Sequence, residues 1–405
     1  MKKKLIKLLT PLLVLGASSC STYSLQTHVV GYLQVDSKFI SAFDTQVVIN
    51  TFSNDANEYV NKNFDSLIWQ YHKLADNNYL YVTKESDTVT STLQNVRYIN
   101  DNGGQVINLS DELYQVLKAG VEFTKFTKGV YNIALKPVID IWKEAFTNSS
   151  LPNNEDILNA LNKVPSYSSI DEYIVLDDKE KTIKLNPLYT ENEITYYPQL
   201  DLGSIAKGWA LDNLATGFEE NSYPALVSLG SSTLGFIGEY PGPSGEPWKL
   251  SYSNPSLEGS STKLLSIKSK DGMLVSTSSD SERNIVVNDE ENNTLIYSHL
   301  LDGLTGYSKQ YYRTVSVVSS QESRNAMLLD ALTTYLYSVE EEKIASELKR
   351  FEEYYSLDVD ALYVTPVSKK DINSYNVVMS SSLYNKLDST SLSSSIKSIA
   401  KGDNL

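Results

Sequence analysis

Strand patterns and helix patterns follow one another irregularly along the chain, and this mixture limits its fold class more than any other feature. Short apolar runs predict strands at residues 47–49, 225–227, 264–267 and 273–276. Apolar residues at helical spacing predict helices at residues 54–71, 205–214 and 323–339, and Ser110 opens a helix-start signature before another helix. The chain is therefore predicted to be α+β, with mixed sheets and helices.

The first 20 residues have the order of a secretory signal segment. Four lysines precede a mostly apolar run at residues 8–15, and small residues at 16–19 lead to Cys20. The apolar run is shorter than the roughly 20 residues that a membrane-spanning helix needs. We therefore predict a lipoprotein signal peptide at residues 1–19, lipidation of Cys20, and a protein anchored on the extracytoplasmic face of a bacterial membrane.

Charge and cysteine content limit the partners. Cys20 is the only cysteine, so the chain without residues 1–19 has no disulfide. Removing the four lysines of that segment changes the formal charge from −15 to −19, which argues against nucleic acid as a partner.

Three further regions are set apart by composition. Residues 20–38 lack a clear period and are predicted to be a tether, with the folded body starting near Phe39. Residues 238–247 are rich in proline and glycine and are predicted to be a surface loop. Residues 366–405 are rich in Ser, Asn and Lys and are predicted to be a peripheral or partly disordered tail.

The segment 201–212, DLGSIAKGWALD, predicts a strand-to-helix turn that favours a phosphate. Gly203 permits a tight turn, the amides of the first helical turn attract an anion, and Lys207 adds positive charge nearby. The same residues also fit a plain turn in which Lys207 and Asp212 face water. Taken alone, the segment leaves both interpretations open.

Two further groups carry candidate chemistry. His299 lies close in sequence to Asp302 and a Thr305–Gly306 turn, and an imidazole beside a carboxylate can accept a proton, although a lone histidine is often structural. His28 and His72 lack such neighbours and are assigned no role.

Asp330 and Thr334 are four residues apart in a predicted helix, so they share a face and offer two oxygens to a hard cation such as Mg²⁺. The alternative is that the Thr334 hydroxyl hydrogen bonds to a backbone carbonyl of the preceding helical turn.

The run at residues 131–142 ends in Trp142, which could stack on a flat ring, although a buried tryptophan usually belongs to the core.

Taken together, these segments resemble the ApbE family of FAD:protein FMN transferases. The family motifs DPTVGPLVNLW, DLGGIAKGYAVD, GGD, SGDYER, HIIDPRTG and ADALATA have counterparts in the same order at residues 132–142, 201–212, 229–232, 278–283, 299–306 and 329–335. The resemblance covers roughly residues 40–365. It implies one T-fold-like catalytic domain, which we place at residues 39–365.

The resemblance also implies an activity and a set of site residues. The enzyme would move FMN from FAD to a Thr or Ser hydroxyl of an extracytoplasmic acceptor flavoprotein with a D-x-x-T/S-G-A-T/S-like motif, releasing AMP. Mg²⁺ would be held by Asp330, Thr334 and the backbone carbonyl of Ala206. His299 would accept the proton, with Asp302 beside it. The residues implied near FAD are Phe43, Trp142, Gly203, Lys207, Leu301 and Thr305.

The chain departs from the family pattern at several positions. The GGD triplet becomes Gly230-Ser231-Ser232, Ser279 replaces a glycine, Ser281 replaces a tyrosine, and Gly303 replaces a proline. Ser279 adds a Cβ to the backbone of a proposed ligand loop. A non-catalytic FAD-binding lipoprotein and an FAD pyrophosphatase therefore stay as alternatives. A substrate-binding lipoprotein of a transporter is a third, but it assigns no role to Asp330 and Thr334.

Overall fold

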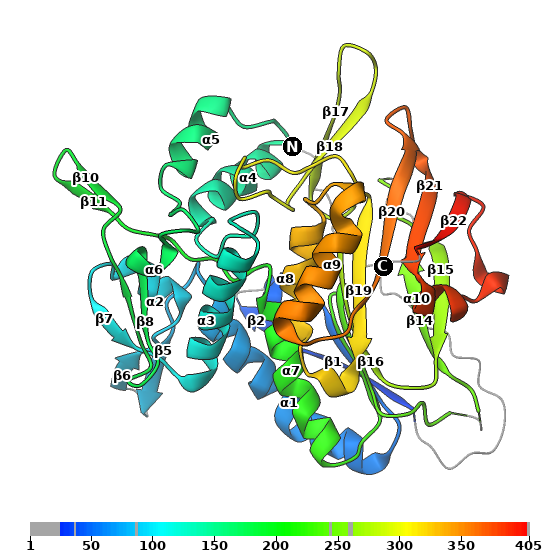
Figure 1. The fold of residues 1–405 in the computed structure, drawn as a ribbon. Coiled ribbons are helices and arrows are strands. Elements are labelled where there is room, and N and C mark those ends of the chain that lie inside the picture. The colour runs from blue at the N-terminus through cyan, green and yellow to red at the C-terminus, as the bar shows by residue number, and fades with distance from the viewer. Residues whose placement is uncertain (1–24, 36–37, 86–87, 243–244, 258–261, 403–405) are drawn as a thin grey trace.

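The computed structural model describes residues 25–35, 38–85, 88–242, 245–257 and 262–402 (Figure 1). Within these residues the fold is built on a nine-stranded sheet in the order β1-β4-β12-β13-β16-β19-β20-β21-β22. Neighbouring strands are antiparallel, except that β21 and β22 are parallel. The strands are β1 (Gln26–Val30), β4 (Val47–Thr51), β12 (Ala225–Leu229), β13 (Thr233–Ile237), β16 (Met273–Ser279), β19 (Thr314–Ser320), β20 (Asp360–Ser368), β21 (Asp371–Ser380) and β22 (Ile396–Gly402).

Helices cover one face of this sheet, and the main hydrophobic core lies between the two layers (Figure 1). The helices begin at side chains that suit a helix start: the hydroxyl of Ser53 accepts a hydrogen bond from the Ala56 amide, and Ser110 does the same for Leu113. The described helices are α1 (Asn54–Ala75), α2 (Val96–Asp101), α3 (Asp111–Phe126), α4 (Lys136–Asn148), α5 (Asn154–Leu161), α6 (Ile170–Tyr173), α7 (Ala206–Glu220), α8 (Ala326–Leu336), α9 (Glu341–Tyr355) and α10 (Ser381–Asn385).

The opposite face of the sheet is covered by the hairpin of β14 (Trp248–Ser253) and β15 (Lys263–Ser269), which encloses a second core. Strand β16 shows how the alternation of a strand serves both cores. Met273 and Val275 contribute to the second core, whereas Leu274 contributes to the core beneath the helices. Ser276 and Ser278 have the same parity as Leu274, so they face the helices.

The remaining strands form small hairpins and one three-stranded sheet around these layers. They are β2 (Tyr32–Val35), β3 (Lys38–Ser41), β5 (Val82–Glu85), β6 (Thr88–Thr92), β7 (Val106–Asn108), β8 (Ile174–Asp177), β9 (Thr182–Leu185), β10 (Tyr189–Glu191), β11 (Ile194–Tyr196), β17 (Asn284–Asn288) and β18 (Thr294–Ser298). A third hydrophobic cluster joins α4 and α5 to residues of β17, β18 and the loop that follows β18.

The predicted mixed α+β class is confirmed, and the predicted strands and helices named above all correspond to observed elements. The predicted loop at 238–247 connects β13 to β14, and its residues 243–244 lie outside the described residues.

The C-terminal segment differs from the prediction of a peripheral or partly disordered tail. Strands β21 and β22 complete the central sheet, and Tyr375, Val377 and Met379 are fully buried in the second core. On the other face of the strand, these residues alternate with Asn376, Val378 and Ser380. The polar residues of β21 and the serine-rich turn before β22 give this segment the composition of a tail, so composition alone did not predict the strand.

The segment predicted as a tether also contains structure. Residues 26–30 form β1, which pairs with β4 at the edge of the central sheet, and residues 32–35 form β2. The folded body therefore begins by Gln26 and not near Phe39. The predicted signal segment and Cys20 lie outside the described residues.

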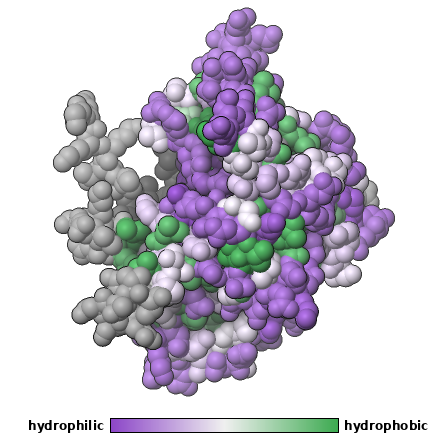
Figure 2. All heavy atoms as spheres, turned by 90° about the vertical axis from the view of Figure 1, so that its left-hand side faces the viewer, coloured by the Kyte–Doolittle hydropathy of each residue, from purple (hydrophilic) through white to green (hydrophobic). Residues whose placement is uncertain are grey.

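Hydrophilic residues dominate the face of the molecule shown in Figure 2, as expected for a chain with a formal charge of −15. Figure 2 shows one face as largely hydrophilic, with smaller hydrophobic patches between the polar residues. Among the described residues, no helix is both long and apolar enough to cross a bilayer.

Candidate active site

The start of α7 brings Lys207 and Gly208 to the centre of the candidate site. The Lys207 ammonium group donates a hydrogen bond to the Ser232 hydroxyl, which lies in the turn before β13. The Gly208 amide donates to Asp330 Oδ2 over 3.1 Å. Gly203 is exposed just before the helix, and its amide donates to Asp201 Oδ1 over 2.7 Å. The predicted turn and helix start are therefore present, with the lysine directed inward, but the turn follows an isolated β-bridge at Gln199 and not a strand.

Asp330 is a buried carboxylate on α8, only 6% exposed. Besides the Gly208 amide, it accepts hydrogen bonds from the hydroxyls of Ser276 at 3.0 Å and Thr233 at 3.3 Å. Burial raises the pKa of Asp330, while the positive charge of Lys207 and these hydrogen bonds oppose the rise. A second positive charge beside Asp330 would therefore stabilise its ionised form.

The hydroxyls around Asp330 come from the helix-facing side of the sheet and were not predicted. Ser276 and Ser278 on β16 both hydrogen bond to the hydroxyl of Thr333, at 3.3 and 3.0 Å. The available signal was the pair of serines at two-residue spacing in a strand that begins with three apolar residues. It becomes informative only when the strand is known to pass under α8.

The donors near Asp330 suit a hard cation. Carboxylate and hydroxyl oxygens are the ligands that Mg²⁺ prefers. Thr334 lies on the same face of α8, and its hydroxyl donates to the Asp330 carbonyl over 3.3 Å, as the alternative interpretation required. In the part of the chain that the structure describes, no cluster of three or more His, Cys, Asp or Glu side chains could hold a metal. A cation here would therefore depend on one carboxylate, hydroxyls, carbonyls and a ligand.

His299 follows β18 and is partly buried. Burial lowers its pKa, and the charges of Arg283 and Lys207 lower it further, whereas Glu282 opposes this. Its ring therefore favours the neutral form, which can accept a proton. The Lys207 charge lowers the pKa of both His299 and Asp330, although the three side chains come from three separate segments.

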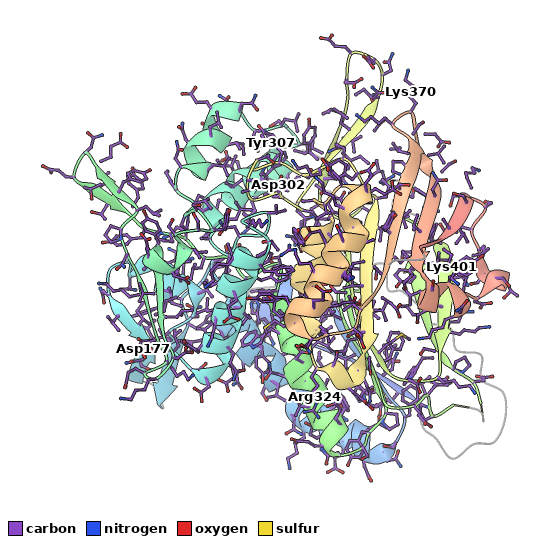
Figure 3. The ribbon with its side chains drawn as sticks, in the orientation of Figure 1. Asp177, Asp302, Tyr307, Arg324, Lys370 and Lys401 are labelled. Carbon is purple, nitrogen blue, oxygen red and sulfur yellow. The ribbon has the colours of Figure 1, made fainter. Side chains whose placement is uncertain are left out.

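Asp302 does not serve as the predicted partner of His299. Its carboxylate pairs with Lys309 at 2.8 Å and accepts the Leu304 amide at 2.8 Å. Figure 3 shows Asp302 and Tyr307 in the same loop, beside α4 and α5. The His299 ring instead has the Arg283 carbonyl 3.4 Å from Nδ1. Asp302 thus stabilises the loop, because its ion pair with Lys309, seven residues later in the chain, connects the two ends of the loop.

Trp142 and Leu301 lie in the third hydrophobic cluster and not on an open surface. Trp142 is 1% exposed, its ring stacks on Tyr297 with centroids 6.0 Å apart, and its N–H donates to the Gly306 carbonyl over 2.7 Å. The ring therefore has no open face for a flavin, and it anchors the 299–306 loop. Thr305 in that loop is exposed.

Phe43 has an unusual backbone that His72 supports. Its φ is 56°, in the left-handed region that is costly for a bulky residue. The Phe43 amide donates to His72 Nδ1 over 3.0 Å, and the two rings meet edge to face at 5.6 Å. Burial lowers the pKa of His72, which keeps this nitrogen free to accept. His72 was assigned no role from sequence, because its partner lies 29 residues away on another element.

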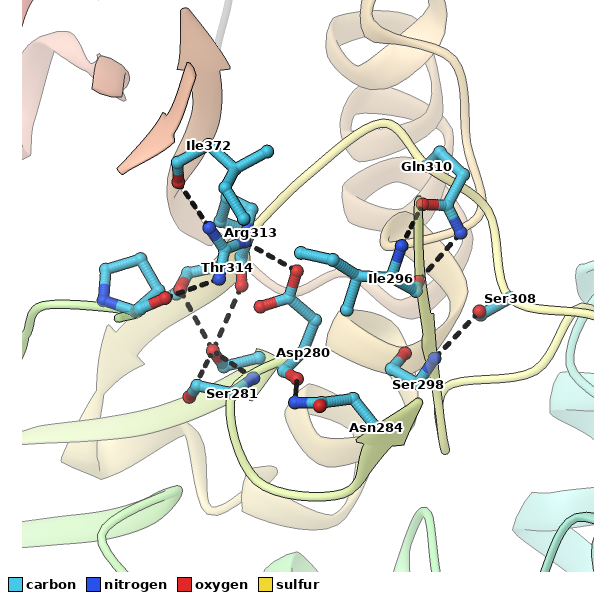
Figure 4. Close-up of polar contacts among 12 residues, drawn as sticks. Asp280, Ser281, Asn284, Ile296, Ser298, Ser308, Gln310, Arg313, Thr314 and Ile372 are labelled. Atoms are coloured by element: carbon cyan, nitrogen blue, oxygen red, sulfur yellow. Dashed lines mark hydrogen bonds and ion pairs between the residues drawn. The ribbon is translucent and has the colours of Figure 1, made fainter. Parts of the chain in front are cut away.

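A buried ion pair supports the segment 278–283 beside the site (Figure 4). Arg313 is 2% exposed and donates from Nε to Asp280 Oδ2 over 2.6 Å, while its other nitrogens donate to the carbonyls of Ile372 and Pro255. The Ser279 hydroxyl, at a position where the family has glycine, donates to the Arg313 carbonyl over 3.0 Å. Arg313 therefore ties the site segment to the C-terminal strands.

Replacing Arg313 with methionine is expected to lower the free energy of unfolding by about 3–5 kcal/mol, since it leaves Asp280 as an unpaired buried charge. Burial already raises the pKa of Asp280 to about 6. A folded-state pKa above the unfolded value means that protonation adds stability as pH falls, so the loss should be smaller at pH 5 than at pH 8. Urea denaturation at both pH values measures it.

The matched control is Lys349→Met, which removes one member of an exposed pair with Glu353 and should change stability little. Wild-type stability of Arg313→Met at pH 8 would show that the pair is not important for folding.

Comparison with known proteins identifies relatives over most of the chain. A sequence profile of the ApbE family matches residues 45–356. The FAD:protein FMN transferase of Haemophilus influenzae is 25% identical over 267 residues, which cover 65% of this chain and 70% of that protein. The protein of the same name from Klebsiella pneumoniae is 24% identical over 280 residues, covering 69% of this chain and 77% of the relative.

Solved structures share the fold. An ApbE protein from Thermotoga maritima superimposes with a TM-score of 0.60 at 22% sequence identity. The matched region covers 84% of this chain and 94% of the Thermotoga maritima chain. The flavin transferase ApbE from Vibrio cholerae superimposes with a TM-score of 0.60 at 17% sequence identity. The matched region covers 90% of this chain and 100% of the Vibrio cholerae chain.

Proposed function

The chain belongs to the ApbE family, and on that premise we propose that it transfers FMN from FAD to a Thr or Ser hydroxyl of acceptor proteins and releases AMP. The chain is an enzyme of the transferase class, and FAD is its substrate. The observation that best supports the finer proposal is the junction of α7 and α8, where the Gly208 amide, next to Lys207, donates to the buried Asp330 carboxylate over 3.1 Å.

The proposed step is a substitution at the phosphorus of the FMN half of FAD. A bond forms from the acceptor hydroxyl oxygen to that phosphorus, and the bond to the bridging oxygen of the pyrophosphate breaks, so that AMP leaves. The hydroxyl proton passes to His299, whose lowered pKa favours the neutral imidazole. In reactions of this type, positioning and charge neutralisation supply most of the rate enhancement.

Asp330, Thr334 and the backbone carbonyl of Ala206 are proposed to hold Mg²⁺, because these are oxygen donors at the meeting point of α7 and α8. When bound, Mg²⁺ supplies positive charge to the pyrophosphate. Lys207 adds charge from the same side. Phe43, Gly203 and Thr305 are proposed to contact FAD, whereas Trp142 and Leu301 act by packing the loop behind it.

The test is co-expression with an acceptor domain that carries a D-x-x-T-G-A-T sequence, followed by mass spectrometry of the acceptor. A mass gain equal to FMN on the threonine supports transfer. Release of FMN and AMP without modification supports an FAD pyrophosphatase, and FAD binding without turnover supports a non-catalytic flavin-binding lipoprotein.

The protein is further proposed to be lipid-anchored at the extracytoplasmic face of the membrane through Cys20, where it would meet extracytoplasmic acceptor flavoproteins. Cys20→Ala is expected to move the protein from the membrane fraction to the soluble fraction, because the lipid is attached to that sulfur. Fractionation followed by immunoblotting measures this, with Ser21→Ala as the control. A Cys20→Ala variant that stays on washed membranes would exclude the anchor.

A further inference from the structure

Asp212 connects two helices of the candidate site without belonging to the set of site residues predicted above. It lies on α7, and its carboxylate accepts the Ala326 amide at 2.7 Å through Oδ1 and the Met327 amide at 2.9 Å through Oδ2. These amides belong to the first turn of α8. The residue that precedes this helix, Asn325, makes no capping hydrogen bond with its own side chain. Asp212 therefore caps α8 from a neighbouring helix.

A second contact lies one turn earlier on the same face of α7. The Gly208 amide donates to Asp330 Oδ2, and a Cβ at position 208 would lie 2.1 Å from the Ala326 carbonyl oxygen. The two helix backbones are thus in direct contact there, which only glycine permits. Gly208 and Asp212 together fix how far α8 is shifted along α7.

We propose that Asp212 is a positioning residue for the phosphate and Mg²⁺ site, because it holds the turn of α8 that leads into Asp330. Ala326 and Asp330 are four residues apart and so lie on one helix face. Movement of that turn would separate Asp330 from the Gly208 amide and so from the first turn of α7. This inference rests on the proposed function, since it concerns how the same site is assembled.

The electrostatics of Asp212 determine the conditions of the test. Burial raises its pKa to about 7, the charges of Glu219 and Asp330 raise it further, and the two amides of α8 oppose the rise. Arg324, two residues before α8, pairs with Glu219 at 2.6 Å. At pH 8 the carboxylate is mostly ionised and accepts both hydrogen bonds, so the measurements belong at that pH.

The experiment compares Asp212→Ala and Asp212→Asn with the wild-type full-length chain. FAD affinity is measured by fluorescence titration at increasing Mg²⁺ concentrations, and transfer is measured in parallel. Asp212→Ala is expected to raise the Mg²⁺ concentration for half-maximal FAD affinity by roughly tenfold, as is common when a residue that orients a metal ligand is lost. Asp212→Asn should shift it less, because its amide oxygen still accepts one hydrogen bond.

Ser53→Ala is the matched control, because it removes a comparable cap from α1. It should lower the melting temperature without shifting the Mg²⁺ half-point. An unchanged half-point in both Asp212 variants would overturn the positioning role and leave the proposed function intact. If wild-type FAD affinity and transfer do not respond to Mg²⁺ at all, the proposed metal site fails, and the role of Asp212 fails with it. If Asp212→Ala does not fold, Asp212→Asn provides the same measurement.

Discussion

Replacing Asp330 with alanine is expected to abolish Mg²⁺-dependent FMN transfer, with a loss of about 10³-fold or more. Asp330 is the only carboxylate among the proposed Mg²⁺ ligands, and without it one hydroxyl and one carbonyl remain to hold a hard dication. Charge neutralisation by a metal ion contributes several kcal/mol, and each 1.4 kcal/mol changes the rate about tenfold. Initial rates of acceptor flavinylation across a Mg²⁺ titration measure the loss.

The fold should survive this substitution. Burial raises the pKa of Asp330, so the ionised carboxylate is unfavourable in its surroundings when no cation is bound. Its removal does leave the Gly208 amide and the Thr233 hydroxyl without an acceptor, and Asp330→Asn keeps one oxygen for them. Thermal unfolding of both variants separates a folding defect from a metal defect. Full activity of Asp330→Ala at low millimolar Mg²⁺ would exclude the assignment.

Elements with a strong local period were predictable. The helix that contains Asp330 and the strand that contains Val275 each bury several apolar side chains close together, so these elements are visible in sequence. Strand β21 buries Tyr375 and Val377 but alternates them with Ser and Asn, and a composition-based reading takes such a segment for a tail. Strand β1 is an edge strand with little buried apolar surface, which weakens its signal in the same way.

Site residues that belong to a sequence motif were predictable. Their hydrogen-bond and ion-pair partners were not, because those depend on which segments the fold brings together. Lys207, His299 and Asp330 were singled out from sequence, and the Lys207 charge lowers the pKa of the other two groups. Asp302 was expected to orient His299, yet it pairs with Lys309, because sequence proximity to a histidine does not show which cation the folded loop brings closer. Asp212 was expected to face water if the turn was plain, and it instead caps α8.

Replacing His299 with asparagine is expected to slow transfer by about 10²–10⁴-fold while FAD affinity stays near that of the wild type. A hydroxyl is a poor nucleophile at neutral pH unless a group accepts its proton, and a positioned base contributes a factor of this size. Because burial lowers the pKa of His299, the neutral base persists below the ordinary histidine pKa of about 6.5.

The acid limb of the wild-type pH–rate profile for His299 should therefore lie below pH 6.5 and disappear in His299→Asn. Asp302→Asn is the control, since its carboxylate pairs with Lys309 and should affect loop stability more than the pH profile. Wild-type rates in His299→Asn would exclude it as the base. Loss of FAD binding together with turnover would show instead that His299 contacts FAD.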